Sequence, residues 1–423
     1  MVCISKFDLT TKEVTKRFSC ESLLDLPWYD WWLRTQLRQQ PKDLYACVRD
    51  FDNEPKDNEF SIVKSLYSRV SDIILQNAPL SLDDIVQTLV EDETIVIGDE
   101  FRGLDSATNL VFSIIGLQTM LYRPDMLSCP PSELGIADEM DGHTGESHIC
   151  LKQSRANSSK LLSDFLLGFG LMLPPKNYHI LDDAEETKAF NRLKSVDSPT
   201  LNAHLLTTIG NVTVKWTDCL ACHLELDRDS GVLYLFRYPS FCKANVNDRS
   251  AQNTNYTNRT VIHSCASSTP SNNHWATPQD VTELLEEVVL SYRLLFGQHP
   301  RSRKLFRNLR PFDHVPPEGR DGLLSDLCGE KAIDASLGIG ERDNYELARD
   351  FPHLRTRLFR LSAYLDERKP RRWRELWLDN RDSASWLTFW AVILIGGIGL
   401  LLAFIQVVLQ VAQIAISLRQ QVS

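Results

Sequence analysis

The sequence predicts an α+β fold, in which a mainly helical domain with a small antiparallel β-meander is followed by one C-terminal transmembrane helix. Three observations lead to this prediction. Apolar residues recur at helical spacing in the first and last thirds of the chain, and the spacing changes to a period of two between residues 205 and 236. An uncharged apolar stretch covers residues 386–418. Two polar stretches, 124–160 and 243–277, are expected to be flexible loops between the structured blocks.

Composition restricts the class of protein. The chain has 423 residues, a net charge of −10 and a mean hydropathy of −0.23. Because 43% of its residues are hydrophobic, it can bury a core, and disorder throughout is excluded. The low mean hydropathy also excludes a multi-span transporter. The acidic balance argues against nucleic acid as a partner.

The first block, residues 1–123, is predicted to be mostly helical. Ser81 and Asp84 have the spacing of a capping box that opens one helix, and Asp105 is expected to cap the next. The cluster Trp-Tyr-Asp-Trp-Trp at 28–32 is too aromatic to be fully exposed. We expect it to lie in the core, with a partner-binding patch as the alternative.

The second block, residues 161–242, contains the predicted meander. Segments 205–208 and 212–216 alternate in polarity on either side of a Gly-Asn pair, which suits a tight turn. Segments 220–226 and 232–236 are joined by a short polar stretch and predict a second hairpin.

The third block, residues 278–385, is predicted to be helical again. Thr277 and Asp280 form a second capping-box pattern, with a proline at the first turn and Gly297 after the last. A further helix over 345–365, interrupted at a proline, leads into a basic juxtamembrane segment.

The apolar stretch 386–418 is predicted to be one transmembrane helix. As a helix it would be about 50 Å long, which exceeds the roughly 30 Å of a bilayer's hydrocarbon layer. Trp386 and Trp390 lie where an interfacial aromatic belt is expected. A helix in the core of a water-soluble protein needs only about 10–14 apolar residues, so we favour the membrane.

The flanking cations predict the orientation. Six lie within 20 residues before the helix, whereas only Arg419 follows it, so the large domain is expected in the cytosol. The N-terminus has no apolar run typical of a signal peptide, and the ten cysteines are scattered as in reducing compartments. With few residues after the helix, we expect a tail-anchored, single-pass membrane protein.

Five of those cations are expected to contact anionic lipid. Each could contribute about 1 kcal/mol beside an anionic surface. The alternative is that they only set the topology. They are Arg368, Lys369, Arg371, Arg372 and Arg374.

Small and amide residues recur along one face of the membrane helix at steps of three and four. Small residues let two helices approach closely, and amides in lipid seek partners, so self-association is a hypothesis. Alternatively, the glutamines lie in the far headgroup layer. The seam consists of Gly396, Gly399, Ala403, Gln406, Gln410 and Gln413.

No motif in the sequence predicts a cofactor or a metal. Cys219-Leu-Ala-Cys222-His223 matches a haem-attachment or redox pattern, but it lies in a predicted strand, where the two cysteines would point to opposite faces. His143, Glu146, His148 and Cys150 offer zinc-binding atoms, yet they lack the spacing of a helical site. No P-loop, nucleophile elbow or three-glycine nucleotide motif occurs.

Several segments carry a family resemblance. They are Asn109-Leu-Val-Phe-Ser-Ile-Ile-Gly116 with Met120-Leu-Tyr-Arg-Pro124, Trp216-x-Asp218-x-Leu220, His223-Leu-Glu-Leu-Asp227, Leu235-Phe-Arg-Tyr-Pro-Ser-Phe-Cys242, Ser291-Tyr-Arg-Leu-Leu-Phe-Gly297 and Leu376-Trp-x-Asp-x-Arg-Asp382. Together they resemble a large family of mostly uncharacterised filamentous-fungal proteins with one C-terminal membrane helix. The resemblance implies no catalytic residues.

We therefore expect a membrane-tethered, non-enzymatic interaction protein that binds membrane lipid and another protein or itself. One alternative is an enzyme whose site is assembled around Asp218, His223 and Arg237. Another is an oligomeric pore lined by the glutamines of the membrane helix. A pocket uniting the three polar residues would favour the enzyme, whereas close packing around them would favour a scaffold.

Overall fold

The computed structural model divides the chain into two compact units, Met1–Asp366 and Glu367–Ser423. We call the first the folded unit. The structure describes residues 26–49, 51, 59–77, 79–97, 101–140, 150–170, 174, 176–177, 184–246, 260–267, 276–330, 342–368 and 383–422.

The described residues of the first block are mostly helical, as predicted: α2 (Pro27–Gln39), η2 (Lys42–Tyr45), α3 (Glu59–Asn77), α4 (Leu82–Glu91) and α5 (Phe101–Thr119). The capping box of α4 is confirmed, because Ser81 and Asp84 each accept a hydrogen bond from the other's backbone N–H. The predicted start of α5 is wrong. The helix begins at Phe101, so Asp105 lies within it.

The aromatic residues of α2 lie in the core, as predicted. Trp28, Tyr29 and Trp32 are buried. The ring of Trp28 stacks on Tyr238, with centroids 3.9 Å apart. Contact with Tyr238, which comes from a distant segment, helps to bury the aromatic rings of α2.

The α+β class is confirmed, but the first predicted hairpin is wrong. Residues Ala203–Thr208 form helix α8, because the side chain of Asn202 caps its first turn by accepting from Leu205 N at 2.9 Å. The chain then turns at Asn211, whose φ is 55°, and enters β4 (Thr213–Thr217).

The three-stranded sheet has the order β4–β6–β5 and is mixed. β5 (Leu226–Asp227) pairs antiparallel with β6 (Val232–Phe236), as the second predicted hairpin requires. β4 instead pairs parallel with β6, over the full register from Thr213↔Val232 to Thr217↔Phe236. Alternating polarity predicts a strand, but it does not predict which strand pairs with it. Pairing between strands adjacent in the sequence was therefore expected, and this gave the antiparallel meander.

Two further antiparallel pairs lie outside the predicted sheet. β1 (Glu133–Gly135) pairs with β2 (Lys152–Ser154), so the stretch expected as a loop at 124–160 contains paired strands. β3 (Ser195–Asp197) pairs with β7 (Asn344–Glu346) and joins segments far apart in the sequence. Strands of three residues are too short to show a hydrophobic period.

The remaining helices of the folded unit lie between residues 155 and 367. The capping box of α11 is confirmed, with Thr277 and Asp280 bonded reciprocally. The helix expected from residue 345 is broken more than predicted, because Tyr345 lies in β7. These helices are η4 (Arg155–Ser159), α6 (Leu162–Leu167), α7 (Ala184–Arg192), η5 (Leu220–Cys222), α9 (Pro239–Asn245), α10 (Val261–Ala266), α11 (Pro278–Tyr292), the π-helix η6 (Arg293–Gly297), α12 (Pro300–Leu309), η7 (Pro317–Gly319), α13 (Gly322–Gly329), α14 (Leu347–Asp350) and α15 (Arg355–Glu367).

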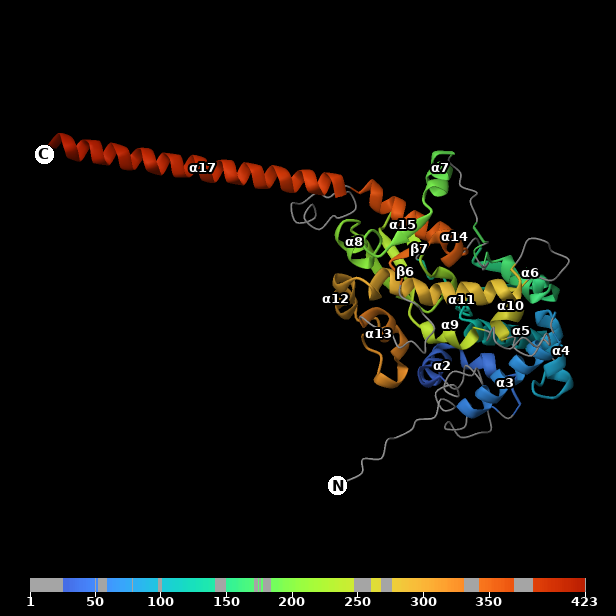
Figure 1. The fold of residues 1–423 in the computed structure, drawn as a ribbon. Helices are drawn as coiled ribbons and strands as arrows, with labels where there is room; N and C mark the ends of the chain where they lie inside the picture. Colours follow the sequence, from blue (N-terminus) through green and yellow to red (C-terminus); the bar gives the residue numbers. More distant parts are fainter. Residues whose placement is uncertain are drawn as a thin grey trace, which may run out of the picture. The chain divides into compact units, whose positions relative to one another are not determined.

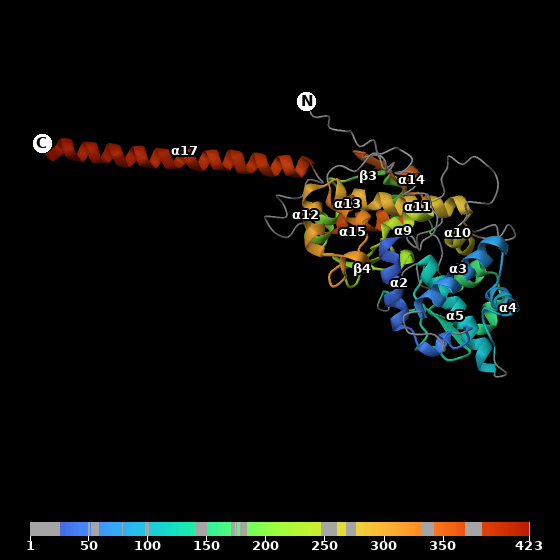
Figure 2. The same cartoon turned by 90° about the horizontal axis from the view of Figure 1, so that it is seen from below.

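The three blocks share one hydrophobic core. A continuous cluster of buried side chains runs from Trp28 on α2 to Leu365 on α15. Helices α3, α4 and α5 gather at one end of the folded unit and α12 and α13 at the other, with α11 running between them (Figures 1 and 2). The central position of α11 places its side chains against segments from most of the chain.

The second unit contains α17 (Ser383–Val422), a helix of 40 residues. Its stretch Trp390–Ile414 is long and apolar enough to cross a membrane, and none of it is buried inside the structure. The predicted candidate span at the C-terminus is therefore confirmed, and it is the single one among the residues that the structure describes.

Candidate functional site

The structure brings Asp218 and Arg237 together. Oδ2 of Asp218 accepts hydrogen bonds from Nη2 of Arg237 at 2.9 Å and from Nε1 of Trp32 at 2.8 Å. The Arg237 Nε donates to the other carboxylate oxygen. Burial alone would lower the pKa of Arg237, but the Asp218 carboxylate outweighs it and raises the pKa. This group of three ties α2 to the sheet.

His223 has different partners and lies fully buried. Its Nδ1 accepts from Phe236 N at 3.2 Å, and its Nε2 lies 2.8 Å from Ser291 Oγ. Because Ser291 donates its own proton to Val288 O, the histidine Nε2–H is the donor to Ser291. Burial lowers the pKa of His223 to about 3, so the ring is neutral.

The three residues of the enzyme alternative therefore do not share a pocket. The cavity beside His223 and the cavity beside Asp218 each have a volume of about 10 Å³. Sites for small molecules usually enclose roughly 300 Å³ or more. At these positions the polar side chains hold the fold together.

The cysteine motif differs from its prediction. Cys219 precedes the short helix η5 and Cys222 lies in it, so they do not alternate across a strand. Both are buried, and the Cys219 thiol together with burial raises the pKa of Cys222. A thiol that stays protonated is a poor nucleophile and a poor metal ligand.

The residues weighed as a zinc site fall mostly outside the described part of the chain. His143, Glu146 and His148 are among these, while Cys150 is exposed. Of the cations expected to contact lipid, Arg368 is exposed, and Lys369, Arg371, Arg372 and Arg374 lie outside the described residues.

All six seam residues lie within α17. Each is exposed, and a Cβ added at Gly396 or Gly399 would meet nothing within 4 Å. The predicted seam is therefore open to another helix or to lipid. It consists of Gly396, Gly399, Ala403, Gln406, Gln410 and Gln413.

A cleft with a volume of about 370 Å³ lies between α5 and the β1–β2 pair. Arg155 lines this cleft, and its guanidinium donates hydrogen bonds to Pro131 O, Asp105 O and Asn109 Oδ1 at 2.7, 3.1 and 2.9 Å. The Cys129 thiol also lines it, and partial burial raises the pKa of that thiol. Neither group is activated for chemistry.

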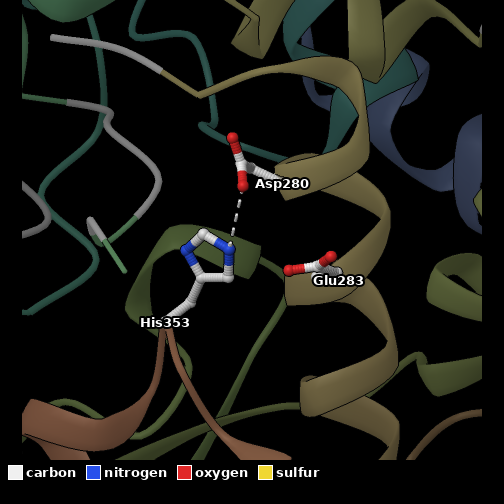
Figure 3. A group of neighbouring side chains, drawn as sticks. All are labelled: Asp280, Glu283 and His353. Atoms are coloured by element: carbon white, nitrogen blue, oxygen red, sulfur yellow. Dashed lines mark ion pairs between the residues drawn. The ribbon is translucent and has the colours of Figure 1, made fainter. Parts of the chain in front are cut away.

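A cluster of titratable side chains lies at the N-terminal end of α11. Asp280 and Glu283 project from adjacent positions on one face of the helix, and the imidazole of His353 points toward Asp280 from the connection between α14 and α15 (Figure 3). One oxygen of each carboxylate and one histidine nitrogen lie within 4.8 Å of one another.

Lys176 lies against the same carboxylates. Its Nζ is 2.5 Å from Asp280 Oδ1 and 2.9 Å from Glu283 Oε2. Partial burial alone would raise the pKa of Asp280 and of Glu283, but hydrogen bonds from Lys176 outweigh it, and both pKa values are lowered. Burial lowers the pKa of His353, so the ring next to this ion pair is neutral near pH 7.

The sequence contained only part of the signal for this cluster. Asp280 and Glu283 are three residues apart in a predicted helix, and this spacing puts them on one face. Asp280 was interpreted only as a cap. His353 follows a proline at a distant position, and only tertiary packing brings it to α11.

Comparisons of this chain with protein-family models, with curated proteins and with solved structures find no match. The resemblance to the fungal family therefore stays a prediction. The geometry itself defines the class, which is a compact α+β unit followed by one long apolar helix that is a candidate membrane span.

Proposed function

We propose that this protein is a single-pass membrane protein whose folded unit stands on the cytosolic side and binds a protein partner rather than catalysing a reaction. One observation carries the proposal. From Val392 to Ile414, α17 exposes apolar side chains on every face outside the seam, and Leu400 and Phe404 are 76% and 67% exposed. A helix that is apolar over most of its circumference needs lipid or other helices around it.

Two further features support the proposal. The cations before the helix outnumber those after it, which favours a cytosolic folded unit. In addition, Asp218 and His223 are occupied in holding α2, α11 and the sheet together. Their commitment to structure favours binding over catalysis.

Extraction of membranes with alkaline carbonate tests the anchor. The full chain is expected to stay in the membrane pellet, and a chain ending before Ser383 is expected in the supernatant. Leu400→Arg should weaken insertion, because a cation at mid-span costs about 2.5–3.5 kcal/mol. The matched control is Leu127→Arg, since Leu127 is 80% exposed in the folded unit. Release of the full chain by carbonate would contradict the proposal.

Glycosylation reports the orientation. A glycosylation sequon added after Ser423 is expected to be modified, since that end should be luminal. Asn157 and Asn211 lie in natural sequons of the folded unit and should stay unmodified. Glycosylation of Asn211 would place the folded unit in the lumen and would contradict the proposed orientation.

We also propose that α17 associates with a second copy along the seam. Gly399 is open to close approach, and Gln410 supplies an amide that gains about 1–2 kcal/mol from a partner in lipid. Gly399→Leu combined with Gln410→Leu should reduce crosslinking between copies in membranes. Gly397→Leu is the control, because Gly397 lies off the seam and is equally open. Equal crosslinking in both variants would rule out the seam.

A further inference from the structure

We propose that Asp280, Glu283 and His353 form a binding site for one divalent metal ion of the zinc class, and that Lys176 competes with the ion for this site. Asp280 and Glu283 come from the first turns of α11, and His353 comes from the connection before α15. The donors are two carboxylate oxygens and one imidazole nitrogen, a set that suits zinc.

In each of the two carboxylates one oxygen is fixed by a neighbour and the other faces the centre. Oδ2 of Asp280 accepts from the Thr277 backbone N–H at 2.7 Å as part of the capping box, which leaves Oδ1 toward the centre. Oε1 of Glu283 accepts from Gln279 Nε2 at 3.1 Å, which leaves Oε2 toward the centre. Such outer hydrogen bonds orient the carboxylates of metal sites.

His353 is oriented in the same way, and it supplies the second, independent observation. Its Nδ1 lies 2.6 Å from Pro174 O, and a carbonyl can only accept, so Nδ1 carries the proton. Nε2 of the neutral ring is then a lone-pair donor. It lies 3.9 Å from Asp280 Oδ1 and has no hydrogen-bond partner among the described residues (Figure 3). The side chain is only 2% exposed, so bulk water does not satisfy this nitrogen.

Hydrogen bonds to a carboxylate on α11 fix the backbone at His353. Glu287, one turn after Glu283 on α11, accepts from His353 N at 3.0 Å and from Leu354 N at 2.7 Å. Glu287 is itself buried. The histidine is therefore positioned before any ion binds, and this lowers the entropic cost of binding.

Lys176 pairs with only two of the three donor groups in this cluster. Its ammonium meets the free oxygens of Asp280 and Glu283, but an ammonium that donates to both oxygens leaves the Nε2 of His353 without a partner. A divalent ion would bond to all three donors and would cancel both carboxylate charges. Since the Lys176 side chain is 43% exposed, it can move into solvent when an ion takes its place.

The donor set also selects the kind of ion. Magnesium and calcium prefer oxygen donors, so the imidazole favours zinc, or cobalt and nickel as its analogues. Zinc holds its donors at about 2.0–2.2 Å, so the two partly buried carboxylates have to move inward as the ammonium leaves. Three protein donors leave a position for water, as in open zinc sites.

Zinc titration of the full chain in detergent, after treatment with a chelator, tests the site. The variants are Glu283→Gln, which removes a donor at a partly exposed position, and Lys176→Met, which removes the competitor. Glu185→Gln is the matched control, because Glu185 pairs with Lys188 on an exposed helix turn. His148→Ala controls for zinc bound by the loop that contains His143 and Cys150. Calorimetry gives affinity and stoichiometry, and X-ray absorption gives the donor types.

The full chain is expected to bind one zinc ion through one nitrogen and several oxygens. Glu283→Gln should weaken binding by about tenfold or more, and Lys176→Met should tighten it by a similar factor. Neither control should change it. Equal affinity in Glu283→Gln and the full chain would overturn the proposal, and so would loss of binding in His148→Ala. Absence of zinc binding in both the full chain and Lys176→Met would overturn it as well.

Discussion

Arg357 and Glu225 form an ion pair in the core of the folded unit. Nη2 of Arg357 lies 2.8 Å from Oε1 of Glu225, and each side chain is 4% exposed. Nη1 of the same arginine donates to the backbone oxygen of His223 at 2.5 Å. The last helix of the folded unit, α15, is thereby bonded to the segment that leads into β5.

Removal of the arginine should be strongly destabilising. In Arg357→Met the Glu225 carboxylate is left buried without its cation, and such a loss costs about 3–5 kcal/mol. The double variant Glu225→Gln with Arg357→Met should recover part of that stability, because no buried charge remains. Denaturant unfolding measures both. A single variant that loses less than about 1 kcal/mol would show that the pair is not buried as described.

Gly297 should tolerate no side chain. A Cβ at this position would lie 2.3 Å from Arg293 Nη1 and 2.4 Å from the backbone oxygen of Leu327. Arg293 is buried and donates to Leu327 O and Glu330 O, so a shift away from the new Cβ would break these hydrogen bonds. Overpacking of this kind costs about 1–3 kcal/mol.

The comparison for Gly297→Ala is Gly322→Ala, measured by the same thermal unfolding. A Cβ at Gly322 meets nothing within 4 Å, so that variant should unfold close to the parent temperature. If both variants shift the unfolding temperature equally, the close approach at Gly297 is not the cause.

Acid should destabilise the folded unit partly through His223. Burial, with a smaller effect from Arg357, lowers the pKa of this histidine from 6.5 to about 3. Because the folded-state pKa is depressed, the neutral ring contributes stability above pH 6.5, and this contribution is lost as the pH falls toward 3. The shift corresponds to a loss of up to about 5 kcal/mol.

Unfolding free energies measured from pH 7 to pH 3 check this prediction in the parent and in His223→Asn, which cannot take up the proton. The variant is less stable at pH 7, but its stability should depend less on pH across this interval. Parallel pH profiles would mean that His223 does not titrate with folding.

The carboxylate of Asp218 should hold α2 to the sheet. In Asp218→Ala both Trp32 Nε1 and the Arg237 guanidinium lose their acceptor, and a lost hydrogen bond to a charged group costs about 1.5–3 kcal/mol. Asp30→Ala is the comparison, because Asp30 pairs with Arg34 and Lys64 at the surface and should cost less than about 1 kcal/mol. Equal losses of unfolding free energy in the two variants would contradict a structural role for Asp218.

Local signals predicted the starts of two helices, α4 and α11, but not helix α8. The two capping boxes, Ser81 with Asp84 and Thr277 with Asp280, were predicted because both partners lie within one helical turn. The burial of Trp32 was predicted from composition alone, since an indole in water is costly. Partners far apart in the sequence were not predicted in the same way.

The three-stranded sheet and the cluster of Asp280, Glu283 and His353 show what local sequence signals could not predict. The alternation in β6 predicted a strand, yet the parallel partner β4 was placed in a hairpin with residues that form α8. Likewise, Asp280 and Glu283 were readable as one helix face, but nothing near them in the sequence pointed to His353. Each of these pairings depends on how the segments between them pack.

By itself, the sequence determined the α+β class, the helix starts with capping boxes and the apolar C-terminal helix, because these depend on neighbours within a few turns and on the transfer of side chains out of water. Only the tertiary structure decided that β4 runs parallel to β6, that His223 and Asp218 bond to separate partners, and that His353 reaches α11. Those arrangements are set by close packing between distant segments, in which most buried polar groups find hydrogen-bond partners.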